Sequence, residues 1–343
     1  MLSGCSLGYY VQSARGQAAL MSQRVPIDEV VADPATAADL RARLEKVQEA
    51  RKFASDVLGL PENKGYRSYA DIGRPYAVWS VSATEEFSLE PLRWCFPVAG
   101  CVSYRGYFNE ASAQRFAERL RGRGLEVSVR GVAAYSTLGY FDDPVLSSML
   151  RWDDIELIAI VFHELAHQLV YVKNDSPFNE SFASVVEQVG MSLWTQQRGL
   201  PNELQAYQER LASKREFAAL IAEVRAELDA LYASGASEAE KRRRKSALFA
   251  TLVRRYEARR DAGKISRGYD AWFARDLNNA DLAAVGLYQQ WVPAFQVLLA
   301  RSGHDLQALY AEARRLGKMR AEEREEVLLE LSKRAQTEQS EFR

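Results

Sequence analysis

The segment DDIELIAIVFHELAHQLV, residues 153–170, constrains the fold of this 343-residue chain more strongly than any other. Asp153 can cap the start of a helix, and Glu156 stands three residues further on, as in a capping box. Trp152 and Leu157 occupy the two positions of a hydrophobic staple. Apolar residues cover most sides of the turns that follow, so the sequence predicts a buried helix.

This helix carries two histidines and a glutamate. His163 and His167 are four residues apart, so both imidazoles project from one helix face and can bind the same Zn²⁺. Glu164 lies between them and can act as the general base without being a ligand. The chain has only three histidines, and two of them are used here. We therefore predict one Zn²⁺ per chain in a catalytic site. The alternative is a buried helix whose histidines only form hydrogen bonds.

A second helix is expected directly after the first. Residues 173–175 form a short loop, Ser176 is a good N-cap, and Pro177 suits the first helical position. The helix would run from about Pro177 to Trp194. Because the loop is short, the two helices should be antiparallel.

Glutamates on the second helix complete the expected site. With a rise of about 1.5 Å per residue, Glu180 lies at the height of His167 on the facing helix, and Glu187 lies near the height of His163. We assign Glu180 as the third metal ligand, which leaves the fourth position open, as in catalytic zinc sites. Glu187 is assigned as the carboxylate that orients His163. The alternative exchanges the roles of the two glutamates.

The segment 179–183, Asn-Glu-Ser-Phe-Ala, matches the second motif of the gluzincin metallopeptidases, Asn-Glu-x-x-Ala. Over roughly residues 5–300, the chain resembles a bacterial family of zinc-dependent aminopeptidases that are lipoproteins of the cell envelope. The stretches that carry this resemblance are 8–10 with Gln12, 94–108, 135–141, the two zinc helices, and 278–280 with Tyr288. The resemblance implies peptidase activity on a peptide substrate.

The chain as a whole is expected to be α+β and mostly helical, with a small sheet beside the histidine helix, as in zincin folds. Residues 76–83 alternate in the manner of a strand, 98–107 and 125–136 are further strand candidates, and 110–121 is a helix candidate. The predicted parts are a lipoprotein N-terminus at 1–7, a zincin-like catalytic part at 8–200, a helical part at 201–316, and a charged tail at 317–343.

Several further residues are candidates for contact with substrate. Segment 132–138 is the candidate edge strand for binding an extended peptide by β-addition, which makes Ser136 a substrate-binding residue; ordinary sheet core is the alternative. Tyr288 is the first candidate for stabilising the oxyanion and Tyr140 the second, and packing in the core is the alternative for either. Asn279 either holds substrate backbone or caps a helix.

Charge and cysteine content point to the partners and the compartment. The net charge of −1 gives no electrostatic reason to bind nucleic acid. Leu2-Ser3-Gly4-Cys5 fits a bacterial lipobox, so Cys5 is expected to carry a lipid anchor that holds the protein to a membrane in the periplasm. A chance match is the alternative. In such an oxidising compartment, Cys95 and Cys101 are expected to form a disulfide, with two reduced thiols as the alternative.

The function predicted from the sequence is therefore that of a zinc-dependent peptidase. Two other classes stay open, a non-catalytic or latent zinc-binding lipoprotein of the envelope and a zinc hydrolase of a non-peptide amide. Glu164 argues against the first of these, because a structural zinc site needs no general base. The sequence indicates no oligomeric state.

Overall fold

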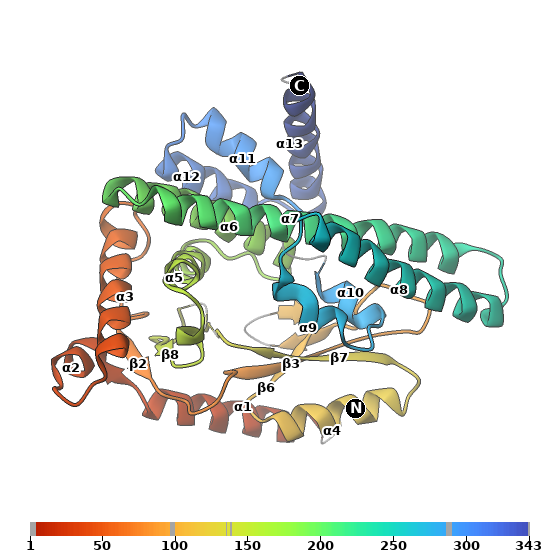
Figure 1. The fold of residues 1–343 in the computed structure, drawn as a ribbon, viewed down its shortest axis with the longest axis horizontal. Coiled ribbons are helices and arrows are strands. Elements are labelled where there is room, and N and C mark those ends of the chain that lie inside the picture. Colours follow the sequence, from red (N-terminus) through yellow and green to blue (C-terminus); the bar gives the residue numbers. More distant parts are fainter. Residues whose placement is uncertain (1–4, 97–99, 135, 138, 286–289, 342–343) are drawn as a thin grey trace. The chain divides into compact units, whose positions relative to one another are not determined.

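The computed structural model describes residues 5–96, 100–134, 136–137, 139–285 and 290–341 (Figure 1). Helices make up 63% of the structure and strands 10%, which confirms the predicted mostly helical α+β class. No helix in the described part combines the length and the apolarity that crossing a bilayer requires.

The chain forms two compact units, each built from separated segments. Unit 1 comprises Met1–Val78, Gly131–Leu204 and Tyr288–Arg343, and unit 2 comprises Trp79–Arg130 and Gln205–Leu287. The parts expected from the sequence were consecutive stretches of chain. The two units depend on long-range contacts that gather separated segments into one core, and sequence patterns, which mark local elements, do not show such contacts.

Unit 1 is organised around two helices, α5 (Asp154–Leu169) and α6 (Ser176–Arg198), which pack against each other. Helix α3 (Ala38–Asp56) packs on α5, and α11 (Val292–Arg301) packs on α6. The remaining helical elements of this unit are α1 (Cys5–Ser22), α2 (Ile27–Ala32), the 3₁₀ helix η1 (Met149–Arg151), α12 (Leu306–Gly317) and α13 (Ala321–Glu341).

Local signals set the ends of α5 and α6. The Asp153 side chain accepts a hydrogen bond from the Glu156 backbone N–H at 2.9 Å, as expected for the start of α5. The predicted N-cap of α6 is wrong by one residue. Asp175 accepts from the Phe178 N–H at 3.1 Å, so Ser176 is already helical. Helix α6 also continues past Trp194 and ends at Arg198, and the following Gly199, with a φ of 62°, is its left-handed C-cap.

A glycine lets the core of unit 1 close tightly at α5 and α6. A Cβ on Gly190 would lie 2.8 Å from side-chain atoms of both Leu58 and Phe162, so only glycine fits without a shift. Beside it, the rings of Phe53 and Trp194 make an edge contact with centroids 5.3 Å apart. This packing presses the face of α6 that carries Glu180 against the histidine face of α5.

The segment expected as a charged tail is helical from Ala321 to Glu341. Its Arg324 side chain is buried and donates two hydrogen bonds, at 2.6 and 2.8 Å, to the Asp175 carboxylate. The same aspartate caps α6, so α13 is tied to the start of that helix.

Unit 1 has one small sheet in the order β1-β2-β8, with strands Val25–Pro26, Ser68–Ala70 and Val145–Leu146. Strand β2 pairs antiparallel with β1 (Val25↔Tyr69) and parallel with β8 (Tyr69↔Val145). The sheet joins the segment after α3 to the segment before α5.

Unit 2 holds a sheet in the order β6-β3-β7 and a two-stranded β4-β5 sheet. Helices α7 and α8 form the antiparallel hairpin drawn in green and teal in Figure 1. The elements are β3 (Val78–Thr84), β4 (Trp94–Phe96), β5 (Gly100–Val102), β6 (Arg105–Tyr107), α4 (Glu110–Arg121), β7 (Glu126–Val132), α7 (Pro201–Ala233), α8 (Glu238–Asp261), η2 (Arg267–Tyr269), α9 (Asp270–Phe273) and α10 (Asn279–Val285).

Three of the strand predictions need correction. The candidate 125–136 is a strand only from Glu126 to Val132. The candidate 98–107 is divided into β5 and β6, with residues 97–99 outside the described part. The candidate edge strand 132–138 is wrong, because β7 ends at Val132 and the described residues 133, 134, 136 and 137 are not in a strand. Asp143 draws the chain into a turn there by accepting a hydrogen bond from the Thr137 N–H at 2.7 Å.

Cys95 and Cys101 lie directly opposite each other in β4 and β5 and are joined by a disulfide, which confirms the predicted pair. The bond closes a hairpin whose two strands are only three residues long. Cross-linking of so short a pair limits the conformations of the unfolded hairpin.

Candidate metal centre

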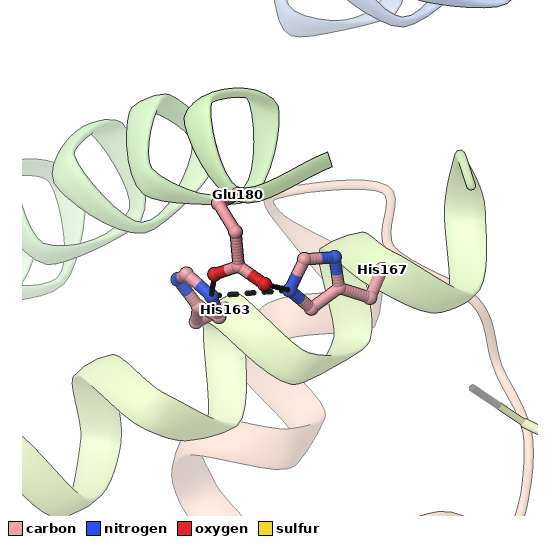
Figure 2. A group of neighbouring side chains, drawn as sticks. All are labelled: His163, His167 and Glu180. Atoms are coloured by element: carbon pink, nitrogen blue, oxygen red, sulfur yellow. Dashed lines mark hydrogen bonds and ion pairs between the residues drawn. The ribbon is translucent and has the colours of Figure 1, made fainter. Parts of the chain in front are cut away.

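His163, His167 and Glu180 meet at the contact between α5 and α6. Figure 2 shows the Glu180 carboxylate reaching from α6 to the two imidazoles carried by α5. One donor atom from each side chain lies within 4.8 Å of the others. The side chains are 12%, 6% and 24% exposed, respectively. The structure thus brings together the three residues expected to bind one metal ion.

The spacing of these donor atoms fits a zinc ion. His163 Nε2 lies 3.1 Å from His167 Nε2. Each nitrogen faces a different oxygen of Glu180, Oε2 at 3.4 Å from His163 and Oε1 at 3.6 Å from His167. Bonds of about 2.0–2.1 Å to a tetrahedral zinc would place ligand atoms about 3.3 Å apart. The observed distances scatter around that value. Two imidazoles and one carboxylate are also the donor types of many catalytic zinc sites.

The outer nitrogens of the two histidines differ. Glu187, one turn after Ala183 on α6, lies 2.9 Å from His163 Nδ1 through its Oε2 atom. This contact leaves His163 Nε2 facing Glu180, as the assignment of Glu187 as the orienting carboxylate requires. His167 Nδ1 is buried and has no hydrogen-bond partner within the described residues. Among the described residues, a carboxylate therefore contacts the Nδ1 atom of His163 but not that of His167.

A proton shared within the cluster settles on His163. Burial lowers the pKa of His163, but hydrogen bonds to Glu180 and Glu187 outweigh burial and raise it well above its ordinary value. Burial, followed by the positive charge on His163, lowers the pKa of His167 to about 4. Burial raises the pKa of Glu180, but the hydrogen bond to His163 and the charges of the histidines lower it overall. A cation in the cluster must therefore displace one proton.

Glu164 is next to the centre and carries a pKa suited to proton transfer. Burial raises the pKa of its carboxyl to about 7, opposed first by the positive charge of His163 and reinforced by the negative charge of Glu180. The Ser136 hydroxyl hydrogen-bonds this carboxyl and lowers its pKa. A carboxyl with a pKa near 7 is accessible in both protonation states at neutral pH, which a general base needs.

The other predicted substrate-site residues lie in different surroundings. Ser136 is beside Glu164, in the turn that follows β7. Tyr140 is 68% exposed and interacts electrostatically with Tyr171, which in turn feels the charge of Glu180. Tyr288 and the Cys5 side chain lie outside the described residues.

Asn279 lies in unit 2, where its side chain is fully buried. Its amide nitrogen donates to the Glu86 and Ser88 carbonyl oxygens at 3.0 Å each, and its carbonyl oxygen accepts from the Tyr232 hydroxyl at 2.8 Å. These contacts tie α10 to the segment after β3. Its predicted contact with substrate stays a prediction.

Sequence reasoning missed three residues around the centre. Tyr66 is buried and close enough to Glu164 and Asp143 for their charges, after burial itself, to raise its pKa well above the ordinary value. Asp143 is buried and hydrogen-bonds Ser136 and Thr137. Tyr171 lies near Glu180. No periodicity marks these residues, because each lies in a loop that reaches the centre through tertiary contacts.

The family model described as "Putative aminopeptidase" matches residues 8–328. The chain therefore belongs to this family, and the family name indicates a peptidase. Comparison with the curated proteins and with the solved structures gives no match to either.

Proposed function

We propose that this member of the aminopeptidase family is a zinc-dependent peptidase in which His163, His167 and Glu180 hold the metal and Glu164 is the general base. The observation that carries the proposal is the convergence of the two Nε2 atoms, 3.1 Å apart, on the Glu180 carboxylate, whose two oxygens lie 3.4 and 3.6 Å from them, separations suited to ligands that share one ion. Family membership supports the reaction class.

When bound, zinc supplies a Lewis acid that activates water and polarises the carbonyl of the scissile bond. Glu164 accepts the proton of the attacking water and returns a proton to the leaving amine. Glu187 keeps the His163 imidazole oriented by holding the proton of Nδ1. The burial that raises the Glu164 pKa to about 7 makes this carboxylate basic enough for the transfer.

The family name favours removal of the amino-terminal residue of a peptide. Comparing an aminoacyl reporter with the same reporter acetylated at its amino group tests this preference. An aminopeptidase cleaves only the free amine, and an endopeptidase cleaves internal bonds of a quenched peptide library. Cleavage restricted to non-peptide amides would point to a cell-wall linkage instead.

The site proposal is tested by zinc content and hydrolysis in the same samples of wild type, Glu164→Gln and His167→Ala. We expect about one zinc per chain in wild type and Glu164→Gln, and loss of zinc in His167→Ala. Hydrolysis should fall by at least about 100-fold in both variants. His304→Asn is the matched control, because His304 is exposed and has a φ of 63°, which asparagine tolerates.

The outcomes separate the function classes. Zinc in the wild type without turnover of any substrate would favour a zinc-binding protein without catalytic activity. Absence of zinc from every sample, even after remetallation, would refute the metal centre. Full activity of Glu164→Gln would refute the assigned base.

We also propose that the protein works outside the cytoplasm, anchored by a lipid on Cys5. The disulfide between Cys95 and Cys101 supports an oxidising compartment. Labelling of cells with a fatty-acid analogue should mark the wild type and not Cys5→Ser. Equal labelling of both proteins would refute the anchor.

A further inference from the structure

The loop between α5 and α6 connects the helices that carry the candidate metal ligands. It comprises residues 170–175, and it joins α5, which ends two residues after His167, to α6, which begins four residues before Glu180. The buried Asn179 accepts a hydrogen bond from the Val172 N–H at 2.7 Å and donates to the Val172 carbonyl oxygen at 2.8 Å. The position of Glu180 relative to His167 therefore depends on the conformation of this loop.

Helices α12 and α13, drawn in blue in Figure 1, are joined by a turn that contacts the same loop at two points. A Cβ on Gly317, the last residue of α12, would lie 2.9 Å from the Val172 Cγ2 atom, so the two residues are in close contact. Arg324 donates from Nε and Nη2 to the Asp175 Oδ2 atom at 2.8 and 2.6 Å. Its Nη1 atom donates to the Met319 carbonyl oxygen at 2.9 Å, so the arginine also fixes the turn.

Asp175 links the start of α6 to α13 through separate oxygens. Its Oδ1 atom accepts from the Phe178 N–H at 3.1 Å, whereas Oδ2 is the atom that binds Arg324. The Arg324 side chain is 5% exposed, and its guanidinium lies 5.5 Å from the centre of the buried Phe178 ring. Because a partly buried charge without a partner is unfavourable, loss of Arg324 should let the carboxylate turn toward water and loosen the first turn of α6.

We propose that the turn between α12 and α13 positions the metal centre, with Arg324 as a positioning residue that acts through Asp175 on the start of α6 and thereby on Glu180. The inference rests on the proposed function, in which Glu180 is a ligand. Zinc binding and the docking of α13 are then coupled, and each strengthens the other by the same factor because coupling between two equilibria is reciprocal.

The chain offers two controls for the loss of this contact. Arg320 pairs with Glu323 at 2.6 Å, but its side chain is 77% exposed and its partner lies on α13 itself. Arg320→Met therefore removes an arginine ion pair from the same segment. Tyr310→Phe removes a buried hydroxyl that donates to the Leu58 carbonyl oxygen at 2.8 Å, so it should lower the unfolding equilibrium stability by about fivefold through a partner outside the loop.

The first test measures zinc affinity by competition with a chelator, at a temperature at which circular dichroism shows every protein to be folded. Arg324→Met and Asp175→Asn should each lower the affinity by about tenfold. Asparagine can still cap α6, so Asp175→Asn removes the partner of Arg324 and keeps the cap. The double variant should lose no more than the larger single effect, since both changes break one contact. Arg324→Lys restores the charge and should stay within about threefold of the wild type, and Arg320→Met and Tyr310→Phe within about twofold.

The outcomes separate this inference from the proposed function. Wild-type affinity in Arg324→Met, or single effects that multiply in the double variant, would overturn the positioning role. A loss of affinity in Tyr310→Phe as large as in Arg324→Met would also overturn it, because general stability would then explain both. A wild type that binds no zinc would refute the metal centre and this inference with it. The expected losses of affinity in a protein without hydrolytic activity would support the inference and refute the peptidase.

Hydrogen exchange measures the reciprocal effect on α13. The amides near the buried Leu328 and Leu331 should exchange about tenfold more slowly when zinc is added to the wild type. In Arg324→Met, zinc should leave these exchange rates unchanged. Equal slowing of exchange by zinc in the two proteins would overturn the coupling through Arg324.

Discussion

Two clusters of buried charge, one in each unit, use their charges differently. In unit 2, the buried Lys245 is paired with the Glu126 carboxylate and donates to the Glu86 carbonyl oxygen at 2.7 Å. Glu126 also accepts from the Asn279 N–H at 2.8 Å. Lys245 therefore neutralises Glu126 within the chain, and the cluster has a structural role.

The cluster in unit 1 lacks such compensation. Glu164, Glu180 and Glu187 surround two histidines, of which His163 takes the proton. Buried carboxylates without matching cations cost stability unless a charge arrives from outside. Excess buried acid therefore distinguishes the candidate metal centre of unit 1 from the structural ion pair of unit 2.

The largest expected effect tests the role of Glu180. Glu180→Gln removes the proposed anionic ligand, so we expect zinc affinity to fall by at least about 100-fold and hydrolysis to be lost with it. Competition with a zinc chelator measures the affinity. A normal affinity here, with a large loss in Glu187→Gln, would show that the two glutamates exchange roles.

Removing the charge of Lys245 should lower the stability of the fold and leave zinc binding unchanged. Lys245→Met leaves the partly buried Glu126 without its partner, so we expect the free energy of unfolding to fall by about 3 kcal/mol. Zinc content should not change. The exposed neighbour Arg244 gives the control, since Arg244→Met should stay within about 0.5 kcal/mol. Loss of zinc in Lys245→Met would contradict the view that the Lys245 cluster is purely structural. Urea denaturation and elemental analysis measure the two quantities.

A smaller loss of zinc affinity is expected when Glu187, which contacts His163 Nδ1, is substituted. Glu187→Gln keeps the shape of the side chain but weakens its hold on Nδ1, so zinc affinity should fall by about 10- to 100-fold. Glu29→Gln, an exposed substitution of the same kind, should leave it unchanged. Equal affinities for Glu187→Gln and the wild type would remove Glu187 from the centre.

The pH dependence of zinc binding has a definite sign. Because the pKa of His163 is raised in the metal-free protein, its imidazole is protonated at neutral pH and zinc must displace that proton. Affinity should rise about tenfold per pH unit until the pH passes this raised value. The His163 contribution to metal-free stability runs the other way. It is full below the unfolded pKa of 6.5 and is lost as pH rises through the folded pKa.

Proton release on binding can be measured by calorimetry in buffers of different ionisation enthalpy. About one proton per zinc is expected near neutrality. Affinity that does not change between pH 6 and 8 would contradict the assignment of a shared proton to His163.

Some of the candidate centre was predictable because helix geometry is local. The spacing of His163 and His167 and the position of Glu180 on the facing helix follow from the rise and period of an α-helix. The Asp153 cap was equally readable, since its partner is three residues away. The position of the α6 cap was missed because Asp175 and Ser176 are both good caps and only the backbone decides between them.

Sequence patterns were sufficient to predict the class of the fold, the helix that carries the two histidines, and the cysteines that can pair. The end of β7 at Val132, the turn around Asp143, and the position of Tyr66 near Glu164 depend on tertiary contacts. The two groups of features differ in the sequence distance over which the deciding interactions act. Caps and periodicity act over a few residues, whereas the surroundings of a buried carboxyl are set by segments that meet only when the core closes.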